Sequence, residues 1–372
     1  MIKKIGIITL SASDNCGSLL QCYALKKLLE PYGDVEVINF SSMLSHKIYD
    51  IPKVKLKDKI RVFLHLKKKI NLDSLKKCKK DYQDFRVNQL EISGEEIFPE
   101  NLREIEDKYD IVVAGSDQVW NVKMADYDES FFCDWVSSTK VAYAPSLGGH
   151  DIMEADNPYK IIEMLGKFKY LSVREEFGKK CLENILNKPV EKVLDPTLVL
   201  DKKYYLSLIN EPVVKGDYIF YYSWAYCNED SLNIVKAEAK RLNMPVIVVD
   251  ARKWLKRDVN KYDFILSPEE GPLAFLNLMY HANQVYVESF HGMIFAYLFR
   301  KNFYLLDTHE RFEELDSRLA EFVNLLGARD RIITKYNYNN IDFSKNVSYA
   351  DNKLLSDLKS VSKEYIRKMI GD

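Results

Sequence analysis

Short runs of β-branched and aromatic residues alternate along this chain with segments of helical periodicity, and this alternation constrains the fold more than any other feature. The predicted strands are 5–10, 35–40, 111–114, 141–144, 170–173, 193–194, 218–222, 245–249, 264–266, 285–287 and 303–306. Amphipathic segments at 19–29, 176–186, 228–242, 272–282 and 310–326 lie between them. Such alternation predicts an α/β fold in which parallel sheets are covered by helices on both faces.

The length of 372 residues favours two domains rather than one. A boundary is expected near 209–215, where Glu211-Pro212 interrupts a helical pattern and Gly216 precedes a new strand. We therefore expect a Rossmann-like domain at 1–210 and a second one at 215–345, facing each other across a cleft. A last helix at 350–370 is expected to pack back on the first domain.

The net charge of −1 argues against a nucleic-acid binder, but it hides a basic insertion at about 53–80. This insertion holds twelve Lys or Arg and two Asp, a charge of +10. Apolar residues recur within it at mostly helical spacing: Leu56, Ile60, Phe63, Leu64 and Ile70. Two interpretations stay open, a solvated helix packed on the first domain and a surface that contacts an anionic membrane.

The N-terminal residues and the cysteines indicate in which compartment the protein is located. The apolar run at 5–10 is too short for the core of a signal peptide, and no stretch approaches the length of a membrane-spanning helix. The six cysteines are scattered, so they are expected to be free thiols in a reducing compartment. We expect a cytoplasmic protein, and a location at the inner face of the membrane stays open.

In open α/β sheets, ligands bind beyond the carboxyl ends of the strands, so the residues that follow each strand are the candidate site. Asn15 and Gly17 lie in a polar turn that leads into a helix, which suits an anion or simply caps the helix. Ser116, Asp117 and Gln118 follow the strand at 111–114. Asp117 could orient a substrate hydroxyl or act as a base, or it could cap a helix.

Three further strand ends carry charged or titratable residues. Arg174 follows 170–173 and could hold a carboxylate or phosphate, or pair internally with Asp195 or Glu175. Asp195 could cap a turn or line the cleft. His291 opens a helix after 285–287 and has the placement of an acid–base catalyst.

Other chemistries have weaker support. Asp126 and Asp128 form an Asp-x-Asp pair in a loop without an adjacent apolar run, so no metal site is expected. No nucleophile elbow is present. Cys16, near a helix start, is interpreted as a small filler rather than a reactive thiol.

Taken together, these turns resemble the polysaccharide pyruvyl transferase family over residues 5 to about 331. The matching segments are 5–9, 15–25, 115–121, 143–148, 172–175, 194–198, 289–292, and a trailing group formed by Ser317, Arg318, 325–327 and Arg331. The sequence departs from the family pattern at Cys16, Pro145, Leu147, Leu273 and Ala274. These departures affect the choice of acceptor more than the reaction type.

The resemblance implies two Rossmann-like domains in a GT-B-like architecture, with phosphoenolpyruvate as donor and a sugar diol as acceptor. The product would be a cyclic pyruvate ketal, with release of phosphate and no further cofactor. Arg174 would bind the donor, and His291 would be the acid, with Ser289, Phe290 and Gly292 around the donor. Asp117 and Asn15 would lie on the acceptor side as hydroxyl ligands or base, with Asp117 counted as a catalytic residue beside His291. The residues that would bind the acceptor or line the cleft are Asn15, Gly17, Ser116, Gln118 and Asp195.

The acceptor sugar could be lipid-linked, nucleotide-linked or polymeric. Two competing functions remain at this stage. One is a GT-B-type glycosyltransferase that uses a nucleotide sugar, and the other is a binding protein that has lost catalysis. The absence of an acidic pair at Leu273 and Ala274 argues against the first, and the presence of Arg174 and His291 argues against the second.

Overall fold

The computed structural model describes residues 2–51, 72–254, 258–307, 317–343, 345, 347, 349 and 352–371. The first sheet has the order β2-β1-β3-β4, and all its pairs are parallel. Its strands are β1 (Lys4–Ile8), β2 (Asp34–Val37), β3 (Ile111–Ala114) and β4 (Thr139–Ala142). A parallel pair, β5 (Ser172–Val173) and β6 (Glu191–Lys192), extends it through a bridge from Val141 to Tyr170.

The second sheet is also wholly parallel and has the order β12-β11-β10-β7-β8-β9. Its strands are β7 (Ile219–Tyr222), β8 (Val246–Val248), β9 (Phe264–Leu266), β10 (Gln284–Val287), β11 (Phe303–Leu306) and β12 (Ile332–Ile333). This is the strand order of the dinucleotide-binding fold, whose direction of progression reverses between the first and fourth strands. The reversal falls here between β7 and β10. The prediction of an α/β fold with two parallel sheets is confirmed.

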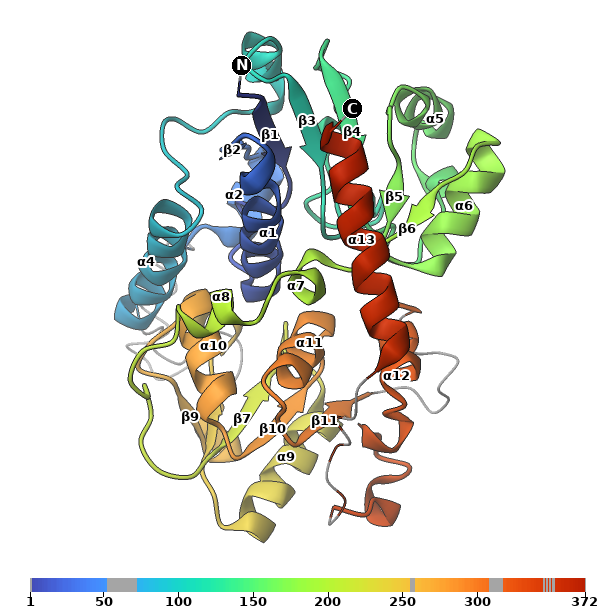
Figure 1. The fold of residues 1–372 in the computed structure, drawn as a ribbon. Helices are drawn as coiled ribbons and strands as arrows, with labels where there is room; N and C mark the ends of the chain where they lie inside the picture. Colours follow the sequence, from blue (N-terminus) through green and yellow to red (C-terminus); the bar gives the residue numbers. More distant parts are fainter. Residues whose placement is uncertain are drawn as a thin grey trace.

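Helices cover both sheets, as parallel strands require. Those before the second sheet are α1 (Cys16–Leu29), α2 (Met43–Tyr49), α4 (Leu72–Asn88), α5 (Pro158–Gly166), α6 (Glu176–Leu186), α7 (Pro196–Val199) and α8 (Lys203–Leu206). Those that follow are α9 (Glu229–Leu242), α10 (Gly271–His281), α11 (Phe290–Leu298), α12 (Ser317–Leu326) and α13 (Lys353–Gly371). The sheets lie one above the other, and the carboxyl ends of β1 and β7 point toward each other (Figure 1).

One apolar cluster runs through both halves of the molecule. It includes Ile7 and Leu20 beside the first sheet and Phe220 and Phe275 beside the second. The predicted boundary at 209–215 lies in the connection between α8 and β7. The two sheets are therefore joined by buried apolar packing and not by a linker alone.

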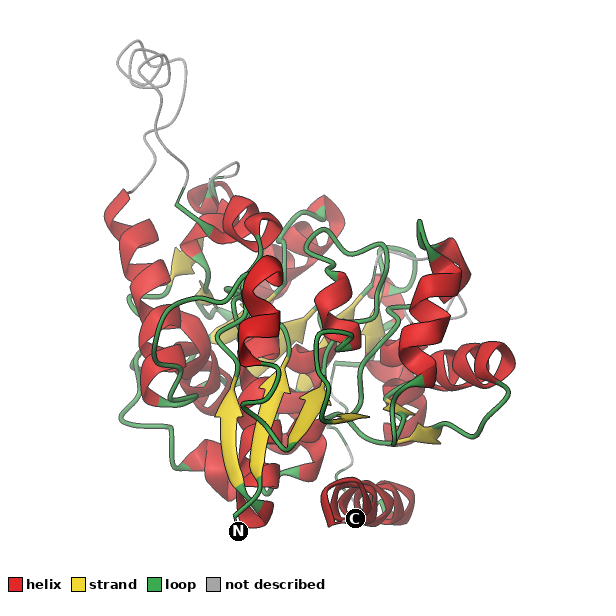
Figure 2. Cartoon of the chain, turned by 90° about the horizontal axis from the view of Figure 1, so that it is seen from above, coloured by secondary structure: helices red, strands yellow, loops and turns green. Residues whose placement is uncertain are grey.

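The last helix, α13, rises from the second half and runs along the first sheet (Figure 1). Three hydrogen bonds fix it there: Tyr365 Oη to the Ala142 carbonyl at 2.9 Å, the Leu194 amide to Ser362 Oγ at 2.9 Å, and Lys3 Nζ to the Ile370 carbonyl at 2.6 Å. The last of these brings the two ends of the chain to one side of the molecule (Figure 2).

Several details differ from the sequence predictions. Strand β12 was not predicted, and β6 begins two residues before the predicted 193–194, because its two residues are Glu191 and Lys192 rather than apolar. Residues 52–71, which contain most of the basic insertion, lie outside the described residues, and 72–80 belong to α4. Within the described ranges, no helix is long and apolar enough to span a membrane.

Candidate active site

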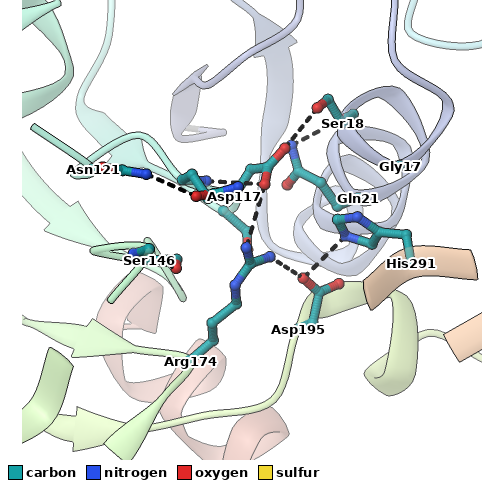
Figure 3. A network of polar contacts seen from close by, with 12 residues as sticks. Gly17, Ser18, Gln21, Asp117, Asn121, Ser146, Arg174, Asp195 and His291 are labelled. Carbon is teal, nitrogen blue, oxygen red and sulfur yellow. Dashed lines mark hydrogen bonds and ion pairs between the residues drawn. The ribbon is translucent and has the colours of Figure 1, made fainter. Parts of the chain in front are cut away.

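A buried arginine lies at the centre of the candidate site. Arg174 follows β5 and is only 1% exposed at its side chain. Its Nη1 lies 2.8 Å from Asp195 Oδ2, and its Nη2 lies 3.3 Å from Asp117 Oδ1 (Figure 3). The internal pairing with Asp195 that the sequence left open is thus present. Because an unpaired buried charge is costly, these three residues stabilise one another.

His291 joins this cluster from the second sheet. Ser289 caps α11, so the ring of His291 emerges from the first turn of that helix. Its Nε2 lies 3.4 Å from Asp195 Oδ2 (Figure 3). The predicted acid and the predicted donor-binding arginine therefore share a carboxylate partner, although they come from different sheets.

Gly17 makes room for this histidine. A Cβ atom at position 17 would lie 2.3 Å from His291 Nδ1, which is much closer than any real contact. The backbone of α1 at Gly17 therefore packs directly against the imidazole of His291. The glycine that the sequence places in a turn suited to an anion thus also allows α1 and α11 to approach each other at the site.

The two aspartates are held in their ionised form. Burial by itself raises the pKa of Asp117, but Arg174 and His291, with a hydrogen bond from Ser18 Oγ at 2.7 Å, outweigh burial and lower that pKa. Burial likewise opposes ionisation of Asp195, and His291, Arg174 and Thr197 together bring its pKa well below the usual range. The cluster therefore carries two negative charges and the positive charge of Arg174.

Helix caps account for two of the predicted residues. The side chain of Asn15 accepts hydrogen bonds from the amides of Gly17 and Ser18, at 2.8 and 3.4 Å. Ser289 Oγ accepts from the Gly292 amide at 3.0 Å. Each cap fixes a helix start beside the charged cluster, so these residues position the site.

The loop after β3 is fixed in a similar way. Ser116 Oγ donates to the Ala144 carbonyl at 2.8 Å, and Asn121 Nδ2 donates to Gln118 Oε1 at 2.8 Å. Asp117 has a φ of +73°, in the left-handed region, and its Oδ1 also accepts from the Gln118 amide. These bonds hold the carboxylate of Asp117 toward Arg174 (Figure 3).

A cavity of about 440 Å³ adjoins the cluster. Its lining residues are Arg174, Lys192, Leu194, Asp195, Leu198, Phe290, Arg318, Glu321, Phe322, Asn324, Leu325, Leu354 and Leu358. The ring centroid of Phe290 lies 5.0 Å from Arg174 Cζ, so this ring packs on the guanidinium, and both residues line the cavity.

Sequence reasoning missed two cations of this cavity. Lys192 lies at the end of β6 and pairs with Glu321 at 2.7 Å, and Arg318 lies in the first turn of α12. Arg318 belongs to a segment that matched the family pattern, and that signal could have identified it. Lys192 had no comparable signal, because its strand was placed two residues too late.

The weaker candidates have structural partners of their own. Asp126 is buried and accepts a hydrogen bond from Tyr49 Oη at 3.1 Å, whereas Asp128 caps a short 3₁₀ helix through the Ser130 amide. Within the described residues, no group of three His, Cys, Asp or Glu side chains could hold a metal ion. Burial raises the pKa of Cys16 to about 12, which makes it a poor nucleophile.

Comparisons with known proteins agree with this architecture. The model of the family described as polysaccharide pyruvyl transferase matches residues 15–310. The fold is similar to that of UDP-GlcNAc 2-epimerase from Methanocaldococcus jannaschii, with 13% identity, a TM-score of 0.52, and coverage of 99% of this chain and 100% of that one.

A second structure of the Methanocaldococcus jannaschii epimerase, in complex with UDP-GlcNAc and UDP, has 15% identity, the same TM-score and the same coverage. At such identities the likeness concerns the fold alone. No curated protein sequence matches the chain.

Proposed function

The chain belongs to the polysaccharide pyruvyl transferase family, and we propose that it moves the pyruvyl group of phosphoenolpyruvate onto a sugar diol of a surface-polysaccharide precursor. The product is a cyclic pyruvate ketal, and phosphate is released. The observation that carries this proposal is the buried cluster of Arg174, Asp117, Asp195 and His291, which draws its members from both sheets.

The reaction needs one proton donor, and it forms two C–O bonds at one carbon of the donor. The vinyl carbon of the donor gains a proton while the central carbon accepts the oxygen of a first hydroxyl, which loses its proton. The second hydroxyl then displaces phosphate from the same carbon and loses its proton in turn. Both steps need a positioned acid or base and a cationic site for the donor.

We assign the acid to His291 on grounds of position. The first turn of α11 carries this residue to the charged cluster, where its Nε2 lies 3.4 Å from Asp195 Oδ2, the carboxylate that also pairs with Arg174. A histidine at this place can serve as the acid for the vinyl carbon of the donor. Because the pKa of Asp117 is lowered, its carboxylate serves better as a ligand for an acceptor hydroxyl than as a base.

The adjoining cavity supports a route for the donor. Arg174, Lys192 and Arg318 line it, against the two acids Asp195 and Glu321. Phosphoenolpyruvate carries a carboxylate and a phosphate, and guanidinium groups bind both in a fork. We place the donor on this side of Arg174, between Phe290 and Arg318, and the acceptor on the side of Asn15 and Asp117.

The competing use of a nucleotide sugar has less support. An acidic residue does stand near the carboxyl ends of β8 and β9, namely Glu270. Its two oxygens, however, accept the amides of Asp250 and Ala251. Because both carboxyl oxygens already accept backbone amides, they are not free to bind the hydroxyls of a ribose.

A cytoplasmic location and peripheral contact with an anionic membrane remain part of the proposal, through the basic insertion at 53–80. Its test is cosedimentation with anionic and neutral vesicles. We expect binding to anionic vesicles only, weakened by salt and by changing Lys67, Lys68 and Lys69 to Glu. Equal binding by the wild type and the triple variant would contradict this part of the proposal.

The test of function is phosphate release from phosphoenolpyruvate, measured with methyl glycosides and short oligosaccharides of galactose, N-acetylglucosamine and N-acetylmannosamine. We expect release that depends on the acceptor, and heat of binding for phosphoenolpyruvate in calorimetry. A calorimetric response to nucleotide sugars, with none to phosphoenolpyruvate, would favour the glycosyltransferase instead. Binding of phosphoenolpyruvate without turnover on any acceptor would favour a binding protein.

A further inference from the structure

One tryptophan differs from the others in its exposure. Trp120, Trp135 and Trp254 are at most 6% exposed, whereas Trp224 is 63% exposed. Within the described part of the chain, its ring stacks on no other aromatic ring. A single exposed apolar side chain is common on protein surfaces, so the place of Trp224 in the fold has to decide whether it has a role.

The turn that carries Trp224 is firmly built. Ser223 Oγ accepts the amides of Ala225 and Tyr226, at 3.2 and 2.9 Å, and it donates to Glu288 Oε2. Tyr226, two residues after the exposed Trp224, is fully buried. The turn therefore presents Trp224 from a fixed backbone, and not as the tip of a loose loop.

This turn lies at the point where the strand order of the second sheet reverses. Trp224 follows β7 and His291 follows β10, and these two strands are neighbours. The Glu288 amide donates to the Tyr222 carbonyl at 3.0 Å, and a Cβ atom on Gly292 would lie 3.1 Å from Tyr222 Cδ1. The first turn of α11, which carries His291, thus packs on the strand end that leads to Trp224. In sheets of this kind, ligands bind at the reversal point.

We propose that the indole of Trp224 is a platform for a pyranose ring of the acceptor. This inference rests on the proposed function. A pyranose presents a flat face of C–H groups, which complements the negative face of an indole. The donor is a small anion that gains nothing from that face, so the residue contributes to acceptor binding and not to donor binding. Glu288 accepts a hydrogen bond from Ser223 in this turn and directly precedes Ser289, the cap of α11. This contact fixes the position of Trp224 relative to His291.

The test compares steady-state kinetics of Trp224→Ala and Trp224→Phe with those of the wild type, on the best acceptor of the glycoside panel. We expect Trp224→Ala to raise the acceptor KM about tenfold, the effect of losing the burial of one ring face. The KM for phosphoenolpyruvate should not change, and Trp224→Phe should recover most of the loss. Tyr159→Ala, at an exposed aromatic on α5, is the matched control.

A binding measurement keeps the inference testable without turnover. Since the other three tryptophans are buried, acceptor oligosaccharide titrated into the protein should quench emission that comes from Trp224. Quenching that is absent in Trp224→Phe supports the platform, even if phosphoenolpyruvate is not turned over. An unchanged acceptor KM in Trp224→Ala, or quenching that persists in Trp224→Phe, would overturn it. A protein that shows this quenching but no pyruvyl transfer would contradict only the proposed function.

Discussion

Gly17 and His291 meet in a contact that only a glycine permits. Alanine at position 17 would place Cβ 2.3 Å from the imidazole, so either the ring or α1 must move. We expect Gly17→Ala to destabilise the protein by about 1–3 kcal/mol and to lower turnover sharply. Gly166→Ala, where a Cβ would meet nothing within 4 Å, is the control. Thermal unfolding and phosphate release measure both effects, and a Gly17→Ala variant with normal turnover would contradict the packing of the site.

His291 should be separable from the fold of the site. We expect His291→Ala to retain the folded structure and to lose about two to four orders of magnitude in turnover, the usual cost of removing a general acid. His150→Ala, at an exposed histidine paired with Glu154, should keep wild-type turnover. Circular dichroism checks the fold. Near-normal turnover of His291→Ala would mean that another residue is the general acid.

Arg174 shows how far a sequence can specify a residue's role. Its place after a buried strand predicted a buried arginine that needs an anion, and the structure supplies Asp195 and Asp117. The sequence could not decide between an internal pair and a donor ligand, because that choice depends on distances between loops far apart in the chain. We expect Arg174→Ala to weaken donor binding and to lower the rate. It should also destabilise the protein, since two buried carboxylates lose their partner.

At the scale of elements, the strands of both sheets were predictable where they are apolar and longer than two residues. Runs such as 111–114 and 303–306 coincide with β3 and β11. The misses occur where the strand is short or polar, as in β12 (Ile332–Ile333) and β6 (Glu191–Lys192). A two-residue strand owes its existence to its neighbour in the sheet, so its own sequence carries too little pattern.

Helix α12 brings Arg318 to the cavity, and this element should control donor binding. We expect Arg318→Ala to raise the KM for phosphoenolpyruvate at least tenfold, which corresponds to one charged hydrogen bond. The acceptor KM should change little. Arg367→Ala, on the exposed face of α13 and paired with Glu364 of the same helix, is the matched control. Equal KM values of the wild type and Arg318→Ala for phosphoenolpyruvate would contradict donor binding in this cavity.

The junction of β8, β9 and α10 should respond to pH through Glu270. Burial, together with the charge of Asp250, raises the pKa of Glu270 to about 8, although backbone amides oppose the shift. The folded state therefore keeps this proton between about pH 4.5 and 8, while the unfolded chain releases it, and stability falls as pH rises through that window.

Replacing this carboxyl tests the linkage. Glu270→Gln cannot titrate, so the loss of stability that it causes should be largest near pH 5 and should shrink toward pH 8. Denaturant unfolding of both proteins across this range measures the difference. A difference in the free energy of unfolding between the two proteins that stays constant, or that grows with pH, would contradict the raised pKa of Glu270.

At the scale of the whole molecule, the site exists only because two sheets face each other. Arg174 and Asp117 come from the first sheet and His291 from the second, and the shared apolar cluster holds them at these distances. The sequence predicted two halves, each with a parallel sheet, and the candidate site residues that follow the strands. It did not predict the cavity, because that space also needs α12 and α13, whose positions follow from packing between distant segments.

The central claim is that this two-sheet cluster transfers a pyruvyl group, and mass spectrometry of the acceptor tests it most directly. After incubation with phosphoenolpyruvate and wild-type protein, the acceptor should gain the mass of pyruvate less one water, with two hydroxyls consumed and one phosphate released per product. His291→Ala should give little or no such product. Phosphate release without any gain in acceptor mass, or a gain only when a nucleotide sugar is supplied, would contradict the account.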